Sequence, residues 1–187
     1  EKARQAPESE QIAALGMSRI GAGACRALSE LSDLTGGEIY SPEIQYHVGI
    51  GYFLRQETEL AIAGYKGVLT AAQTKADRLA WVPKAVKEIG NMLVRQERFL
   101  EAALAYQTVF TEFPNHEGAD DAGRFAVAAS KKAIEQFGED ATDSSATMVK
   151  FARSIEGSLG SSVGGDYKFK LILKNAKDLQ LKHKWVA

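Results

Sequence analysis

The sequence predicts an all-α protein in which antiparallel helix pairs stack as a short solenoid of about seven to eight helices. Three observations lead to this fold class: a segment that repeats 41 positions later, apolar residues at helical spacing, and proline and glycine signals that divide the chain into helices. Self-similarity at a period of about 20 to 50 residues is typical of stacked supersecondary units. The matched positions of the repeat are Pro42 and Pro83, Gly49 and Gly90, Ala61 and Ala102, and Tyr65 and Tyr106.

The composition is that of an ordinary globular protein. The chain has 187 residues, 45% of them hydrophobic and 25% charged, with a formal net charge of −1. This length allows one domain with a sizeable core. A nearly neutral chain has no overall field that would attract nucleic acid, so no nucleic-acid partner is expected.

Two further absences limit the classes of protein. Cys25 is the single cysteine, which excludes an intramolecular disulfide and a cysteine-rich zinc site. No apolar run approaches the roughly 18 to 20 residues that cross a bilayer, so no membrane span is expected. The position of Cys25 in an apolar-periodic segment predicts a buried, unreactive thiol.

The N-terminal segment, residues 1–41, is predicted to be helical. Its apolar residues recur at near-helical spacing up to a stop signal at Thr35, Gly36 and Gly37. The segment reads as one long helix, or as two short helices broken near Gly21–Gly23. The apolar residues at this spacing are Ile12, Leu15, Ile20, Leu28, Leu31 and Leu34.

The central segment, residues 42–116, contains the two repeat units 42–75 and 83–116. Ser41 followed by Pro42 is a helix start, because serine caps free N–H groups and proline is tolerated at the first helical position. Each unit is predicted to be a helix pair, with helices at 42–55 and about 58–72 and again at 83–94 and 99–113. Residues 74–82 are predicted to be a helical extension kinked at Pro83.

Beyond Pro114 the repeat fades, but the helical pattern continues. Residues 117–158 are predicted to form a degenerate third helical pair, followed by a glycine-rich break at 159–165. Residues 166–187 alternate apolar and basic positions in a way that suits a helix or a strand. A C-terminal capping helix is preferred because nothing else in the chain offers a strand partner, and all segments are expected to form one domain.

The two units resemble the tetratricopeptide repeat (TPR), a helix-turn-helix of about 34 residues that stacks as a right-handed solenoid. With Pro42 and Pro83 as first positions, the small eighth residue, the alanine at the twentieth position and the aromatic at the twenty-fourth are the matched pairs given above. Pro114 fits the thirty-second position, whereas Gln73 and the seven extra residues between units depart from the pattern. A generic alanine-rich helical bundle is the plainer alternative.

Part of the second unit resembles repeats of bacterial cell-envelope proteins. This likeness rests on Glu101–Tyr106 and on Phe113–Asn115, followed by an alanine-rich helix. It favours the periplasm or cell envelope over the cytoplasm.

No motif for catalysis is present. His47, His116 and His183 have no second histidine or cysteine three or four residues away, so no metal site is expected. Gly49–Gly51 lacks the third glycine and the preceding strand of a dinucleotide loop, so no cofactor is expected. The sequence therefore predicts a protein that is not an enzyme.

The TPR resemblance implies a concave groove, lined by the first helices of the units, that binds a protein or peptide partner. An alternative is a structural role in which exposed helical faces associate into homo-oligomers. Ile50, Phe53 and Leu54 also suit the core between repeats, and that alternative stays open. The groove residues implied by the resemblance form an aromatic and apolar half, Tyr46, His47, Ile50 and Phe53, and a basic and polar half, Lys84, Lys87, Asn91 and Arg95.

Overall fold

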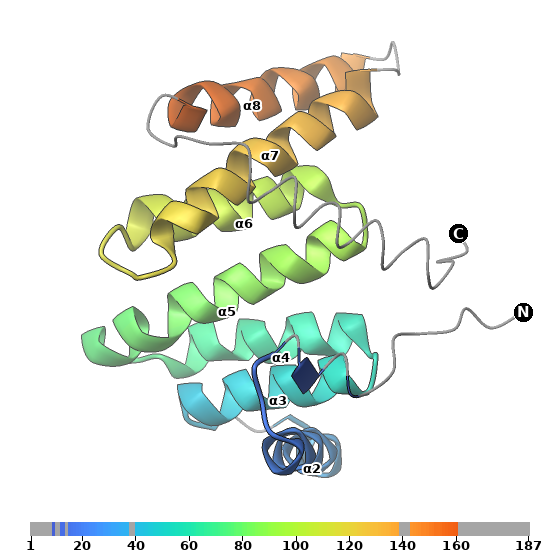
Figure 1. Ribbon diagram of the computed structural model, residues 1–187, viewed down its shortest axis with the longest axis vertical. Coiled ribbons are helices and arrows are strands. Elements are labelled where there is room, and N and C mark those ends of the chain that lie inside the picture. Colours follow the sequence, from blue (N-terminus) through green and yellow to red (C-terminus); the bar gives the residue numbers. More distant parts are fainter. Residues whose placement is uncertain (1–8, 10–11, 14, 38–39, 139–142, 161–187) are drawn as a thin grey trace, which may run out of the picture. The chain divides into compact units, whose positions relative to one another are not determined.

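The computed structural model describes residues 9, 12–13, 15–37, 40–138 and 143–160, without the side chains of 143–145 and 160. Every regular element in this part of the chain is an α-helix, which confirms the predicted all-α class (Figure 1). The chain divides into two compact units between Trp81 and Val82, here called unit 1 and unit 2. The expected single domain stays a prediction, and each unit is described by itself.

Unit 1 contains α2 (Arg19–Thr35), α3 (Pro42–Leu54), α4 (Thr58–Ala71) and the start of α5 (Lys75–Arg95). Helix α3 contacts α2 and α4 (Figure 1). The predicted start of α3 is confirmed, because Ser41 Oγ accepts a hydrogen bond from Ile44 N at 3.4 Å and Pro42 is the first helical residue.

Unit 2 contains the remainder of α5, then α6 (Phe99–Glu112), α7 (Ala119–Gly138) and α8 (Asp143–Gly160). Helix α7 contacts both α6 and α8 (Figure 1). Two contacting helices, α7 and α8, therefore follow the second repeat unit, and the assignment of 117–158 as a degenerate third pair stays a prediction. Helix α8 continues through Leu159 to Gly160, where a break was expected, and the predicted capping helix at 166–187 lies outside the described residues.

The repeat seen in the sequence is also a repeat of backbone structure. Helices α4 and α6 begin and end at positions separated by the same 41 residues. The turns before them match as well, since Gln56 has φ 67° and Glu97 has φ 59°, a left-handed conformation that is uncommon outside glycine. In each turn a backbone N–H closes the same ring: Glu57 N donates to Tyr52 O, and Arg98 N donates to Leu93 O, both at 2.9 Å.

The same side-chain packing holds each pair together. A Cβ added to Gly49 would lie 2.6 Å from Tyr65 Cδ1, and one added to Gly90 would lie 2.7 Å from Tyr106 Cε1. Both distances are shorter than any real contact of a Cβ atom. The missing side chain in the first helix of each pair therefore makes the space that the tyrosine ring of the second helix fills.

Helix α5 shows how the two repeat units are joined in the sequence. The predicted helical extension before Pro83 is confirmed, because α5 runs without interruption from Lys75 and contains this proline. Its start is marked by Thr74, whose Oγ1 accepts a hydrogen bond from Asp77 N at 3.1 Å. The predicted kink at Pro83 stays a prediction.

The N-terminal helix differs from its prediction at its start. Helix α2 passes through Gly21–Gly23 without a break, so a break at that point was wrong. The interruption lies earlier, where Gly16 has φ 63° and Ser18 Oγ then accepts a hydrogen bond from Gly21 N at 3.1 Å. The predicted stop is confirmed, with Gly36 left-handed at φ 71°.

The buried face of α2 does not carry the apolar residues found at helical spacing in the sequence. Ile20 and Leu34 are 87% and 85% exposed, and Leu31 is 46% exposed. The face that packs against α3 instead carries small side chains: Ala22, Cys25, Ser29 and Ser32.

The close approach of α2 to α3 explains this orientation. A Cβ added to Gly51 of α3 would lie 2.0 Å from the carbonyl oxygen of Cys25 and 2.8 Å from Ser29 Cβ. Two helix backbones come this near only where glycine and other small residues face each other. Branched side chains such as leucine do not fit this face, so they are turned away from α3.

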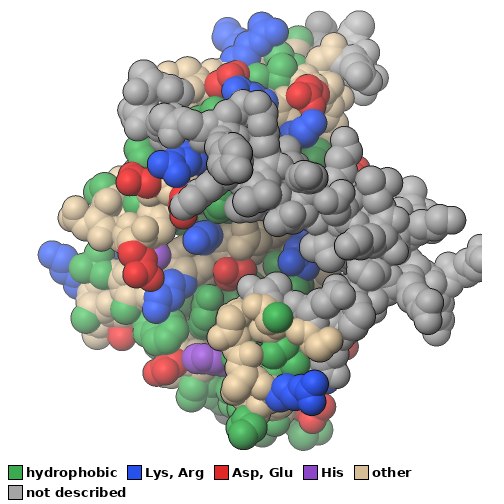
Figure 2. Space-filling view, viewed as in Figure 1, with side chains coloured by type: hydrophobic (Ala, Val, Ile, Leu, Met, Phe, Trp, Pro, Cys, Tyr) green, Lys and Arg blue, Asp and Glu red, His purple; other side chains and the backbone are tan. Residues whose placement is uncertain are grey.

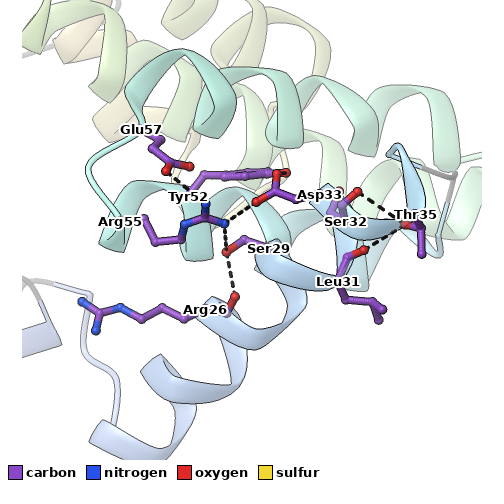
Figure 3. Close-up of polar contacts among 9 residues, drawn as sticks. All are labelled: Arg26, Ser29, Leu31, Ser32, Asp33, Thr35, Tyr52, Arg55 and Glu57. Atoms are coloured by element: carbon purple, nitrogen blue, oxygen red, sulfur yellow. Dashed lines mark hydrogen bonds and ion pairs between the residues drawn. The ribbon is translucent and has the colours of Figure 1, made fainter.

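A polar network on the same side fixes the rotation of α2 (Figure 3). Asp33 Oδ2 accepts a hydrogen bond from Arg55 Nη1 at 2.7 Å, and Asp33 Oδ1 accepts one from Tyr52 OH at 2.7 Å. Arg55 Nη1 also donates to Ser29 Oγ at 3.2 Å, and Arg55 Nη2 pairs with Glu57 at 3.0 Å. These hydrogen bonds lower the pKa of Asp33, that from Tyr52 first and that from Arg55 second.

Candidate partner-binding surfaces

Three rings gather at the surface of unit 1 and form what we call the aromatic cluster: Tyr46 and His47 of α3 and Trp81 of α5. The ring centroids of Tyr46 and Trp81 are 5.8 Å apart, and those of His47 and Trp81 are 6.4 Å apart. Tyr46 and His47 meet edge to face at 5.9 Å. All three side chains are partly exposed, so the cluster presents aromatic surface to solvent.

A buried ring and a backbone hydrogen bond support the side chains of the aromatic cluster. Tyr65 of α4, which is fully buried and packs on Gly49, lies 5.5 Å from the Tyr46 ring. His47 Nδ1 donates a hydrogen bond to the Glu43 carbonyl oxygen at 2.8 Å, which fixes its ring. Packed aromatic side chains of this kind lose little conformational entropy on binding.

The other two residues of the predicted aromatic half have a different place. Ile50 is 5% exposed and Phe53 is 9% exposed, and their neighbour Leu54 is 1% exposed. The structure therefore assigns these side chains to the core, which is the alternative that the sequence left open.

The predicted basic half lies along α5 in unit 2, and its members are not equivalent. Lys84 and Lys87 are partly exposed. Asn91 has a structural role, because its Oδ1 accepts a hydrogen bond from Tyr106 OH at 2.7 Å and its Nδ2 donates to Glu88 Oε2 at 3.1 Å. Arg95 is exposed in the last turn, where a positive charge suits the helix dipole.

His116 joins Lys84 and Lys87 in what we call the basic cluster. Burial lowers the pKa of His116, and the positive charges of Lys87 and Lys84 lower it further, against the opposing effect of Glu117. Its Nδ1 accepts a hydrogen bond from Gly118 N at 3.1 Å, so the proton of the neutral ring is on Nε2. The basic cluster thus places two lysine side chains beside a histidine whose lowered pKa favours its neutral form.

Sequence reasoning missed two of these residues. Trp81 lies in the extension between the repeat units, where the repeat pattern assigns no role, and its aromatic character was the only available signal. His116 lies in the loop after α6, far in sequence from Lys84, so no spacing rule connected them. Only the tertiary structure shows that Trp81 and His116 belong to these clusters.

The charged groups on the surface are otherwise mixed. In the described part of the face shown in Figure 2, acidic and basic side chains are scattered among hydrophobic ones. Among the described residues, no group of three or more His, Cys, Asp and Glu side chains is placed to hold a metal ion. No helix of the described chain is long and apolar enough to cross a bilayer.

Cys25 is buried in the contact between α2 and α3, as expected. It is 2% exposed, and burial raises the pKa of its thiol. A thiol with these properties is a poor nucleophile at neutral pH.

Comparisons of the chain with protein-family models, with curated proteins and with solved structures gave no match in any of the three.

Proposed function

We propose that this protein is a non-catalytic interaction scaffold of the tetratricopeptide-like kind that binds a peptide or protein partner through the aromatic cluster. The observation that carries this proposal is the partly exposed and supported group of Tyr46, His47 and Trp81. In a TPR-like unit the first helix faces the partner. Tyr46 and His47 lie on α3, which is the first helix of the first repeat unit.

The chemistry of the cluster points to the chemistry of the partner segment. Aromatic rings with exposed faces and edges favour apolar, aromatic or proline side chains, and tyrosine and tryptophan are common at the energetic centre of interfaces. Because Tyr65 and the Glu43 carbonyl already hold these rings, little ordering is needed when a partner binds. We therefore expect a short segment with one large apolar anchor.

The basic cluster supplies a second, chemically different surface. Its lysines stand at the matching positions of the second repeat unit, residues 83–116. Lys87 is the repeat equivalent of Tyr46, and Lys84 is the equivalent of Glu43. Lysine side chains bind carboxylates through charge-assisted hydrogen bonds. Acidic residues in the partner are therefore expected to contribute a salt-sensitive part of the affinity.

The test begins with peptides selected from a random library on the immobilised full-length protein and measured by calorimetry. Enriched peptides should carry an aromatic or large aliphatic anchor, and Tyr46→Ala should weaken their binding about tenfold or more. Leu79→Ala is the matched control, because Leu79 is an exposed apolar residue of the same helix as Trp81 and is 53% exposed. Equal affinity of wild type and Tyr46→Ala, with intact helicity, would rule out the aromatic cluster as the binding site.

The contribution of the basic cluster is tested separately with acidic peptides from the same selection. Lys87→Glu should weaken their binding at low salt and have less effect at high salt, whereas Lys131→Glu, at an exposed position of α7, should not. A salt-independent affinity that is unchanged in Lys87→Glu would show that the basic cluster takes no part.

A further inference from the structure

The outward face of α2 carries an apolar stripe with coiled-coil spacing. Between the highly exposed Ile20 and Leu34 lie Ala24, Ala27 and Leu31, all exposed. The intervals along this series are four, three, four and three residues, which place the side chains on one side of a helix. We call these five residues the α2 stripe.

The packing of α2 on α3 keeps this stripe at the surface. Gly51 contacts the Cys25 backbone on the opposite face of α2, so a rotation that turned leucines inward would place them where a single Cβ does not fit. The bonds from Arg55 and Tyr52 to Asp33 oppose the same rotation (Figure 3). The exposure of the stripe is therefore a result of the fold and not of a loosely held helix.

We propose that the α2 stripe binds the α2 stripe of a second copy of this chain, with the two helices antiparallel about a two-fold axis near Ala27. Ile20 and Leu34 lie seven residues on either side of Ala27, and Ala24 and Leu31 lie three and four residues from it. The two-fold operation therefore places Ile20 opposite Leu34, and it places Ala24 within one residue, about 1.5 Å along the helix, of the position opposite Leu31. A surface that is complementary to itself in this way is what a two-fold dimer requires.

Size and charge agree with the antiparallel pairing. Large Leu31 meets the small residues Gly23 and Ala24 of the other copy, while the two Ala27 residues at the centre let the helices approach closely. A parallel pair would instead stack Ala24 on Ala24 and Ala27 on Ala27 between layers of larger residues, which leaves the centre poorly packed. The exposed Glu30 beside the stripe falls opposite Ala24 of the other copy, so no like charges face each other directly.

The width of the stripe sets the expected strength of the dimer. A single helix face is narrower than the roughly 800 Å² per partner of a standard stable interface. The dimer should therefore dissociate in the micromolar range and depend strongly on the few large side chains of the stripe.

The first experiment is sedimentation of the full-length protein between about 1 and 100 µM, the range expected for an interface of this size. Wild type should change from monomer to dimer, whereas Leu31→Glu and Ile20→Glu should stay monomeric at every concentration. Leu79→Glu is the matched control at an exposed apolar position of another helix, and it should dimerise like wild type. A wild type that stays monomeric at every concentration would overturn the proposal. This holds also if the reason is that another part of the same chain covers the stripe.

The second experiment tests the direction of the pairing through disulfide formation under mild oxidation. Ala27→Cys should form a covalent dimer, because the two copies of residue 27 meet at the axis. Ile20→Cys should not, because its two copies would lie about 20 Å apart along the helices. Wild type, with buried Cys25, is the control. Equally fast cross-linking of both variants would contradict the antiparallel dimer.

Discussion

Tyr65 and Tyr106 show how a single residue type shapes each repeat unit. Each ring occupies the space above a glycine of the preceding helix, and Tyr106 is further held by its hydrogen bond to Asn91. Because of this hydrogen bond, the Tyr106 ring cannot move aside for a Cβ atom added to Gly90. The glycine and the tyrosine therefore specify each other, which explains why both recur in the sequence repeat.

Substitution of Gly90 tests this packing. Gly90→Ala should lower the free energy of unfolding by about 2 kcal/mol, because the new methyl group would overlap the Tyr106 ring. Gly23→Ala is the control, since a Cβ there meets no atom within 4 Å and alanine favours the helix by up to about 1 kcal/mol. Urea unfolding measures both. An unchanged or raised stability of Gly90→Ala would contradict the account of the repeat.

His116 gives a prediction about pH. Because burial and the two lysines lower its pKa, the unfolded chain binds a proton at this residue more readily than the folded chain does. The histidine should therefore reduce stability as pH falls below about 6.5, the ordinary pKa of histidine, down to its folded pKa. NMR titration should find its pKa below the ordinary value, and Lys84→Gln with Lys87→Gln should raise it. A pKa at or above the ordinary value in the wild type would show that the basic cluster is not assembled as described.

At the scale of elements, the contact between α2 and α3 depends on close backbone approach. Gly51→Ala would place a methyl group on the Cys25 carbonyl, so we expect it to displace α2 and to cost about 3 kcal/mol. The displacement should expose Cys25 and increase its reaction rate with a thiol reagent, which we expect to be slow in the wild type because the thiol is buried. Gly23→Ala is the control and should leave the reaction rate of Cys25 unchanged. An unchanged rate in Gly51→Ala would contradict the close contact of the two helices.

Asp33 anchors the same helix through charge. Its pKa is lowered in the folded protein, so its contribution to stability is present above the ordinary carboxyl pKa and is lost as pH falls through the folded value. Asp33→Asn should therefore be less stable than wild type at pH 7, and the difference should shrink below about pH 4. Urea unfolding at both pH values measures this, and a difference that persists undiminished in acid would contradict the role of the carboxylate.

The elements also show what the sequence could and could not predict. Start signals and helical spacing predicted α3, α4 and α6 to within a few residues, because capping and turn chemistry are local. The orientation of α2 could not be predicted in this way. Its segment carries an apolar stripe on one side and small residues on the other, and only the position of Gly51 in α3 decides which side is buried. Local periodicity contains no information on that contact.

The whole molecule uses one helix-pair design with two different surfaces. The two repeat units share the bounds of their second helices, the turns before these helices and the glycine–tyrosine packing. Their matched surface positions differ, with Tyr46 in one and Lys87 in the other. This shared frame with different exposed chemistry supports the proposal of a scaffold that would recognise more than one feature of a partner.

The central claim, that the aromatic cluster is the binding surface, is tested most directly by the fluorescence of Trp81. The chain has two tryptophans, so a Trp185→Phe variant leaves Trp81 as the single reporter. Titration with a selected peptide should shift or quench its emission with the same dissociation constant that calorimetry gives, and Tyr46→Ala should weaken both together. Calorimetric binding that leaves the emission of Trp81 unchanged would place the partner elsewhere and contradict the claim.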